Sequence, residues 1–303
     1  MQPPEDFDPP IGIAETLEPG LRRIVAPNPS PMTWRGTNTY LVGTRGLAVV
    51  DPGPADAAHL DAILAACTQG QEITHIVVTH SHLDHSPLAR PLADRSGASV
   101  IAFGGPQAGR SEVMQSLAAS GLAGGGEGID SAFAPDIEVA DGDHITGDGW
   151  RLEVLHTPGH IGNHICLALD ALCLTGDHVM GWASSLVSPP DGDLTDFMTS
   201  CERLRARDWR RFFPGHGAPI ADPMSRLDWL IGHRRAREAA ILQALKDGPA
   251  TASALAARIY TDTPAPLLPA ATRNVLAHLV DLKGKSLAAP DGPMHAESPF
   301  RLS

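Results

Sequence analysis

Six consecutive residues, His80-Ser81-His82-Leu83-Asp84-His85, decide how this chain is to be interpreted. They follow directly on residues 75–79 (HIVVT), a β-branched run that predicts a buried strand. Three imidazoles and one carboxylate cannot all reach one site from a regular strand or helix, but they can from a turn after the strand ends. Imidazole nitrogen and carboxylate oxygen suit zinc, and also iron or manganese. The cluster therefore predicts a metal site.

Three motifs further along the chain offer partners for this cluster. They are TPGH ending in His160, TGD ending in Asp177, and PGHG containing His216. Each follows a predicted strand. Singly they are weak signals, but together with the cluster they supply five histidines and two aspartates. That set is large enough for two adjacent metal ions that share a carboxylate.

With these motifs in this order, residues 20–220 resemble the metallo-β-lactamase superfamily. The hairpin predicted at residues 39–42 and 47–50, which ends in VVDPG, also matches. The resemblance implies an α/β fold, a four-layer αββα sandwich with the metals at one edge. Carried over by position, the ligands of the first metal would be His80, His82 and His160. Those of the second would be Asp84, His85 and His216, with Asp177 bridging both ions.

The C-terminal part differs in composition from the rest. Residues 1–225 carry a net charge of −15 and residues 226–303 a net charge of +3, and all three lysines lie in the second part. We therefore predict a catalytic domain over residues 1–225 and a second domain over 226–303. The latter shows three helical segments (226–245, 251–260 and 270–283) and a short hairpin, which is the winged-helix pattern. Residues 233–238 (HRRARE), residues 259–264 (IYTDTP) and the predicted helix that carries Asn274 and His278 resemble the extension of the beta-lactamase-like protein 2 branch, which includes an endoribonuclease.

The ligand set implies a binuclear metal-dependent hydrolase, with two divalent ions, zinc in first place and iron or manganese as alternatives. Such ions lower the pKa of a bridging water from ~15.7 towards ~7, and the resulting hydroxide attacks an ester, thioester or lactone of a small molecule. Asp84 and Asp177 are the carboxylates on which we expect catalysis to depend. No GxSxG motif is present, and the four cysteines show no metal-binding spacing.

Two alternatives stay open: an endoribonuclease that cleaves single-stranded RNA, and a winged-helix regulator whose metal domain only senses. The acidic N-terminal part and the scarcity of lysine favour a small-molecule substrate. A homodimer is possible, because winged helices often serve dimerisation. The absence of a long apolar run excludes a membrane span, and the acidic N-terminus lacks the features of a secretory signal. We therefore expect a cytoplasmic protein with no membrane partner.

Several residues receive secondary predictions. Asp51 is expected to orient a metal ligand, and His164 to support one. His178, which follows the bridging aspartate, is a candidate for an active-site contact. Trp182, Ser184 and Ser185 are candidates for the lining of the substrate pocket, with simple loop packing as the alternative. By the resemblance, Arg234, Arg235 and Arg237 would face the catalytic domain. Lys283 and Lys285 could contact phosphates, but helix 270–283 lacks the basic face of a DNA reader.

Overall fold

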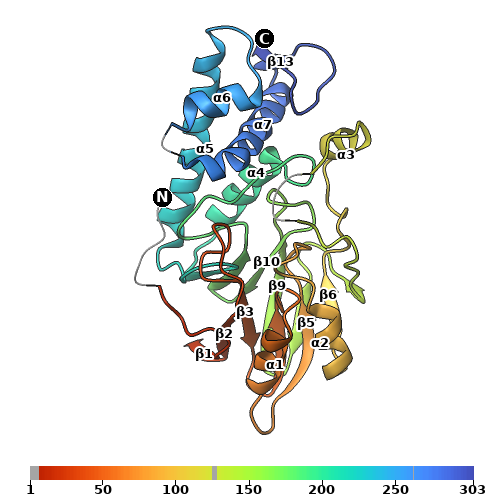
Figure 1. Cartoon of the computed structure of the whole chain (residues 1–303). Helices are drawn as coiled ribbons and strands as arrows, with labels where there is room; N and C mark the ends of the chain where they lie inside the picture. The colour runs from red at the N-terminus through yellow and green to blue at the C-terminus, as the bar shows by residue number, and fades with distance from the viewer. Residues whose placement is uncertain (1–6, 125–127, 262) are drawn as a thin grey trace.

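The structure, a computed structural model, describes residues 7–124, 128–261 and 263–303. Two β-sheets face each other in its N-terminal part (Figure 1). The first contains, in spatial order, β1 (Glu15–Glu18), β2 (Leu21–Val25), β3 (Asn38–Val42), β4 (Gly46–Val50), β5 (Glu72–Val77), β6 (Ser99–Ala102) and β7 (Ile137–Glu138). The second contains β12 (Arg211–Pro214), β11 (Leu172–Gly176), β10 (Ile165–Leu169), β9 (Trp150–His156) and β8 (His144–Gly147). Strands β4 to β7 run parallel, as do β11 and β12.

Helices cover the outer face of each sheet. On the first sheet these are α1 (Ala57–Ala65) and α2 (Ala89–Ser96), which share a buried cluster with β4 to β6. On the second they are α4 (Leu194–Arg205) and the first half of α5 (Pro223–Leu245). A separate apolar layer fills the space between the sheets, with members that include Val50, Val77, Val154, Leu167, Leu174 and Phe213. The predicted αββα sandwich is therefore confirmed.

The C-terminal part is built on the second half of α5. It adds α6 (Ala252–Ile259), the short 3-10 helix η1 (Ala265–Leu267), α7 (Leu268–Gly284) and the antiparallel hairpin of β13 (Ala288–Pro290) and β14 (Phe300–Leu302). These elements share one core with α3 (Glu112–Ala119). The predicted winged-helix arrangement is confirmed.

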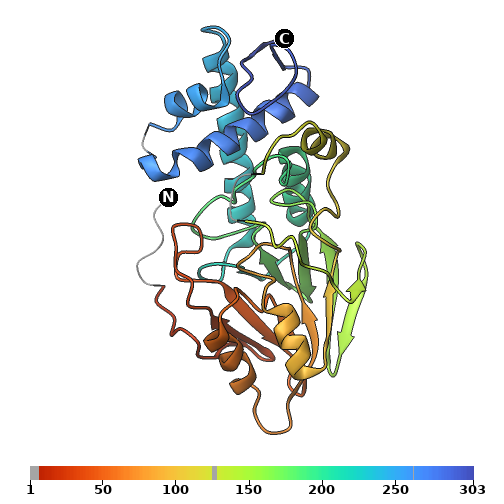
Figure 2. The same cartoon turned by 45° about the vertical axis from the view of Figure 1, so that its right-hand side comes forward.

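The boundary predicted at residue 225 falls in the first turn of α5. That helix begins earlier than expected because Pro223 occupies its first turn and the Asp222 side chain accepts a hydrogen bond from Ser225 N. Figure 2 shows α5 extending from the second sheet into the C-terminal part, so one helix belongs to both. The division into two domains at this residue stays a prediction.

The predicted hairpin matches β3 and β4, while the strand predicted at residues 75–79 begins at Glu72 and ends at Val77. The N-terminal residues 1–6, part of the stretch judged not to be a signal, lie outside the described residues. Among those that are described, no helix combines the length and the apolar character that crossing a bilayer requires.

Candidate metal centre

All seven predicted ligands lie beyond strand ends at one edge of the sandwich. The loop 80–85 follows β5, His160 follows β9, Asp177 follows β11 and His216 follows β12. Two glycines of the motifs are required by close packing. A Cβ on Gly215 would lie 2.3 Å from Asp177 Oδ1, and one on Gly159 would lie 2.3 Å from Phe197 Cα. The Pro-Gly-His motifs therefore let backbone approach where a side chain would not fit.

The ligand atoms gather in three overlapping groups, within each of which they lie no more than 4.8 Å apart. The groups are His80–His82–His160, His80–His85–Asp177 and Asp84–His85–His216. The first and third are the two ligand sets predicted from the sequence. Asp84 is partly exposed, and the other six side chains are buried. The structure thus brings every predicted ligand into one centre.

In the first group, His160 is oriented by a hydrogen bond on its far side. His82 Nδ1 and His160 Nε2 lie 3.0 Å apart. The other ring nitrogen of His160, Nδ1, lies 2.6 Å from the carbonyl oxygen of Leu186. Donating to that carbonyl fixes the His160 proton on Nδ1 and leaves the Nε2 lone pair directed at the centre.

The third group is oriented in the same way. His216 Nε2 lies 3.1 Å from Asp84 Oδ2, and His85 Nε2 lies 3.5 Å from the same oxygen. On the far sides, His216 Nδ1 lies 3.1 Å from the carbonyl oxygen of Gly36, and His85 Nδ1 lies 3.0 Å from Asp51 Oδ2. These contacts direct both Nε2 atoms at the centre, and they show Asp51 in contact with the predicted ligand His85.

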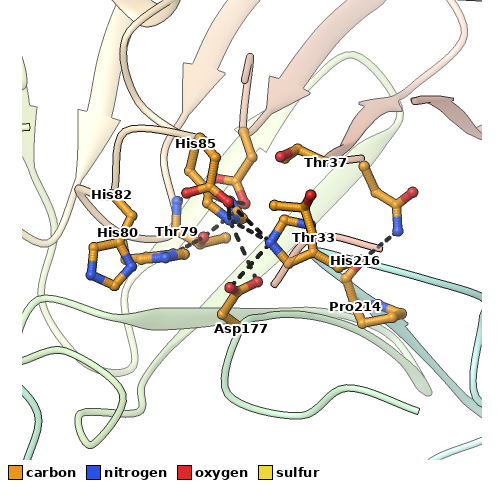
Figure 3. A network of polar contacts seen from close by, with 12 residues as sticks. Thr33, Thr37, Thr79, His80, His82, His85, Asp177, Pro214 and His216 are labelled. Carbon is orange, nitrogen blue, oxygen red and sulfur yellow. Dashed lines mark hydrogen bonds and ion pairs between the residues drawn. The ribbon is translucent and has the colours of Figure 1, made fainter. Parts of the chain in front are cut away.

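Asp177 lies between the two sets (Figure 3). Its Oδ2 is 3.2 Å from His216 Nε2 and 3.9 Å from His160 Nε2, while Oδ1 is 3.5 Å from His85 Nε2. Apart from these contacts with imidazoles, both oxygens of Asp177 are buried without a hydrogen-bond partner among the described residues, as are Asp84 Oδ1 and His80 Nε2. Buried carboxylate oxygens in this state are costly unless a cation compensates them. The donor set therefore fits metal ions, with Asp177 placed to bridge.

The charges at the centre point the same way. Burial opposes protonation of His216, but Asp177 and Asp84 outweigh it and raise its pKa to about 10. Burial likewise opposes protonation of His85, whose pKa the neighbouring carboxylates hold well above its ordinary value. By contrast, burial and the adjacent histidines hold the pKa of His80 well below it. Without an ion, protons on two imidazoles neutralise the carboxylates, and a divalent cation would take their place.

Two further residues support the backbone of Asp177. His164 accepts a hydrogen bond from Asp177 N at Nε2 (3.2 Å), and its Nδ1 lies 2.9 Å from Thr157 Oγ1. Ser185 donates to the carbonyl oxygen of Asp177. The supporting role predicted for His164 thus has a definite contact. Ser185, a candidate for the pocket lining, is fully buried, and its hydroxyl contacts the backbone of Asp177.

His178 packs into the outer core, and the pocket-lining role of Trp182 stays a prediction. His178 Nε2 lies 3.5 Å from Cys201 Sγ, its ring packs 4.6 Å from that of Phe197, and burial lowers its pKa to about 3. It therefore belongs to the outer core. Trp182 is buried against Trp34, with ring centroids 5.7 Å apart. Ser184 is half-buried.

Three arginines of the C-terminal part, Arg234, Arg235 and Arg237, contact other parts of the molecule. Arg234 donates to the carbonyl oxygen of Ser185, and Arg235 pairs with Glu202 of α4 at 2.9 Å, so both face the catalytic part as expected. Arg237 does not, because its guanidinium lies over the Tyr260 ring.

Of the two wing lysines, Lys285 pairs with Glu238 and Asp281, whereas Lys283 is exposed. Sequence reasoning missed the role of Gly36, whose carbonyl orients His216. It also missed Asn274, which bonds to residue 187 beside the centre. No motif marks Gly36, and the family resemblance of the helix that carries Asn274 does not indicate its contact, because each residue acts through a contact between distant segments.

Comparison with known proteins matches residues 32–216 to the metallo-beta-lactamase superfamily and residues 251–291 to the beta-lactamase associated winged helix domain. A Drosophila melanogaster protein named "Beta-lactamase-like protein 2 homolog" is 32% identical over 282 residues, which cover 88% of this chain and 89% of that protein. An atrochrysone carboxyl ACP thioesterase from Cryptosporiopsis sp. is 26% identical, over 78% of this chain and 66% of its own.

Among solved structures, a metallo-beta-lactamase family protein from Thermus thermophilus is 26% identical with a TM-score of 0.74, covering 95% of this chain and 100% of that one. A beta-lactamase domain protein from Burkholderia ambifaria has a TM-score of 0.80 at 21% identity, over 99% and 96% of the two chains. At 21% identity, the likeness to the Burkholderia ambifaria protein shows only that the two chains share a fold. The resemblance predicted from the sequence motifs, including the branch, is confirmed.

Proposed function

The chain belongs to the metallo-β-lactamase superfamily, and on that basis we propose that it is a binuclear metal-dependent hydrolase of a small-molecule ester, thioester or lactone. The observation that carries the proposal is the convergence of two three-residue ligand groups on either side of Asp177. Zinc is the metal proposed, because five imidazoles and two carboxylates form a donor set that it favours. The reaction type, hydrolysis, is inferred from the hydrolases of this superfamily.

When bound, the ions supply a water of lowered pKa and a Lewis acid for the attacked oxygen. The chain's own residues orient this chemistry. Asp51 holds the proton of His85 on Nδ1, and the Leu186 carbonyl does the same for His160, so both rings present a lone pair to the centre. His164 and Ser185 fix the backbone of Asp177 from its two sides.

Water as the nucleophile agrees with the side chains nearby. Burial raises the pKa of the Cys201 thiol, and that of Cys173 as well, so neither offers a thiolate. The Ser185 hydroxyl donates to the carbonyl oxygen of Asp177 and is fully buried. None of these groups is available for covalent catalysis, which supports direct hydrolysis.

Three features support a small molecule over RNA as the substrate. Two relatives named as thioesterases match 77–78% of this chain at 25–26% identity. Trp34 is half-buried, packs against Trp182 and lies in the same loop as Gly36, whose carbonyl oxygen contacts His216. An apolar surface therefore adjoins the centre. Several cations that a polyanion would need, including Arg234, are hydrogen-bonded inside the molecule.

The test is a substrate panel on zinc-loaded protein: acyl thioesters, aryl esters, lactones and single-stranded RNA. Asp177→Ala serves as the inactive control, so that a contaminating hydrolase is recognised. Thioester, ester or lactone turnover that is lost in the control and on chelation supports the proposal. RNA cleavage with the same dependence would favour the endoribonuclease alternative. Metal binding without any turnover, coupled to altered DNA affinity, would favour the sensing regulator.

A further inference from the structure

The irregular segment of residues 185–189, here called the bridging segment, holds two metal-centre residues. Ser185 Oγ donates to the carbonyl oxygen of Asp177, and the carbonyl oxygen of Leu186 contacts His160 Nδ1 at 2.6 Å. Asp177 is the residue placed to bridge, and His160 belongs to the first ligand group. The position of this segment therefore sets the position of residues in both halves of the centre.

No helix or strand fixes the bridging segment. Its partners come instead from α5 and α7. Arg234 donates to the carbonyl oxygen of Ser185, and Asn274 Oδ1 accepts from Val187 N at 3.2 Å. One residue before Asn274, Arg273 donates through Nε to Ser188 Oγ at 2.8 Å and also contacts the carbonyl oxygen of residue 189. Side chains of the C-terminal part thus form hydrogen bonds with residues 185, 187, 188 and 189 of the segment.

Arg234 and Asn274 act together. Arg234 Nη1 donates to Asn274 Oδ1 at 2.9 Å, so the two side chains form one hydrogen-bonded unit that joins α5, α7 and the bridging segment. Arg234 is only 2% exposed, and its guanidinium lies 5.1 Å from the centre of the Phe197 ring. Among the described residues no carboxylate forms an ion pair with it. A buried charge of this kind is expensive, and apolar residues would pack the site at lower cost.

We propose that Arg234 and Asn274 are positioning residues of the metal centre, and that the winged-helix part completes this centre by fixing the bridging segment. The contacts run from Arg234 through Ser185 to the Asp177 carbonyl, and from Asn274 through residue 187 to the neighbouring Leu186 carbonyl on His160. The proposal rests on the proposed function only in that the centre binds metal.

The experiment compares Arg234→Gln with Arg235→Gln in the full chain. The two changes remove the same charge from adjacent positions of α5, but Arg235 pairs with exposed Glu202 and does not touch the bridging segment. The first readout is hydrogen–deuterium exchange of the metal-free proteins over residues 177–189. The second is the affinity for Co²⁺ and its visible absorption spectrum, which reports ligand geometry.

We expect Arg234→Gln to speed exchange in the bridging segment and to weaken Co²⁺ binding about 10- to 100-fold, the usual effect of removing a residue that orients ligands. Arg234→Lys, which keeps the charge but can reach only one of the two acceptors, should recover part of the affinity. Arg235→Gln should match the wild type. Asn274→Ala leaves the buried charge in place and tests the same unit if Arg234→Gln does not fold.

The proposal is overturned if Arg234→Gln and Asn274→Ala lower only the melting temperature, with unchanged exchange at residues 177–189 and Co²⁺ affinity within about twofold of wild type. A purely structural role would give that result. Should the wild-type protein itself bind no metal, the proposed function fails, and the exchange data on metal-free protein still decide whether the C-terminal part fixes the segment.

Discussion

Replacing Asp51 by asparagine is the sharpest test of how the second ligand group is oriented. Asp51 is 2% exposed and accepts three hydrogen bonds: Thr79 N at 2.7 Å, Thr79 Oγ1 at 2.7 Å and His85 Nδ1 at 3.0 Å. The substitution preserves the shape of the side chain and changes only its charge and its acceptors.

The asparagine oxygen can still accept from Thr79 N, but the amide NH₂ then faces Thr79 Oγ1 and His85 Nδ1. His85 can accept from this NH₂ only with its proton on Nε2, the nitrogen that faces the centre. A protonated Nε2 cannot bind a metal. We expect metal affinity at the second group to fall about 10- to 100-fold. Loss of the charge-assisted bonds should lower the free energy of unfolding by about 1–3 kcal/mol.

Metal content measured after dialysis against zinc buffers of graded free concentration gives the affinity, and urea denaturation gives the stability. Asp136→Asn is the matched control, because its carboxylate also accepts from a backbone N–H, Val100 N at 2.8 Å, but contacts no histidine of the centre. The control should bind metal like the wild type. Asp51→Asn protein that holds both metals at wild-type affinity and turns over normally would refute the reasoning.

Three further outcomes are expected. Asp177→Ala should lose turnover and, by elemental analysis, at least one metal equivalent. Its far-ultraviolet circular dichroism should match that of the wild type, because the predicted ligands lie on loops. Near-wild-type turnover would contradict the role assigned to Asp177. In metal-free protein, carboxylates raise the pKa of His216 to about 10 against the effect of burial. The protonated His216 therefore stabilises the fold fully below its unfolded pKa of about 6.5, and this stabilisation is lost as the pH rises through about 10. The melting temperature of the wild-type protein should fall from pH 7 to 10. That of His216→Asn should fall less steeply over the same range. Phe300→Ala, at a fully buried position of the winged-helix core, should cost about 3–5 kcal/mol in urea denaturation, and a change below about 1 kcal/mol would show that this core is loosely packed.

The sequence allowed the ligand set to be predicted because each ligand is local to a recognisable strand end. The motif around His216 needs Gly215 for close approach to Asp177, and such requirements leave visible Pro-Gly signals. Strand β2 was not predicted, because Arg22 and Arg23 interrupt its apolar pattern. Arg23 is nevertheless buried, paired with Glu15 at 2.6 Å across the hairpin. A cross-strand ion pair of this kind cannot be read from one strand alone.

The start of α7 shows a related limit. The helix predicted over residues 270–283 begins at Leu268, with a proline in its first turn, where the missing N–H has no consequence. The function of the bridging segment was equally hidden. Residues 185–189 carry no motif, and their importance arises only from contacts with Arg234, Arg273 and Asn274, which lie 49 to 87 positions away along the chain.

The positive net charge of the C-terminal part takes on a different meaning once its arginines are located. Counted along the chain, the C-terminal part has a net charge of +3, and a basic patch is one feature of nucleic-acid-binding proteins. In the structure Arg226 donates to the carbonyl oxygens of Met180 and Ala183, and Arg234 and Arg273 donate to the bridging segment, so these cations neutralise no external phosphate. They hold the loop that follows Asp177. The same residues cannot both fix this loop and read a duplex, so the charge of this part is better explained by an internal interface with the metal-binding domain.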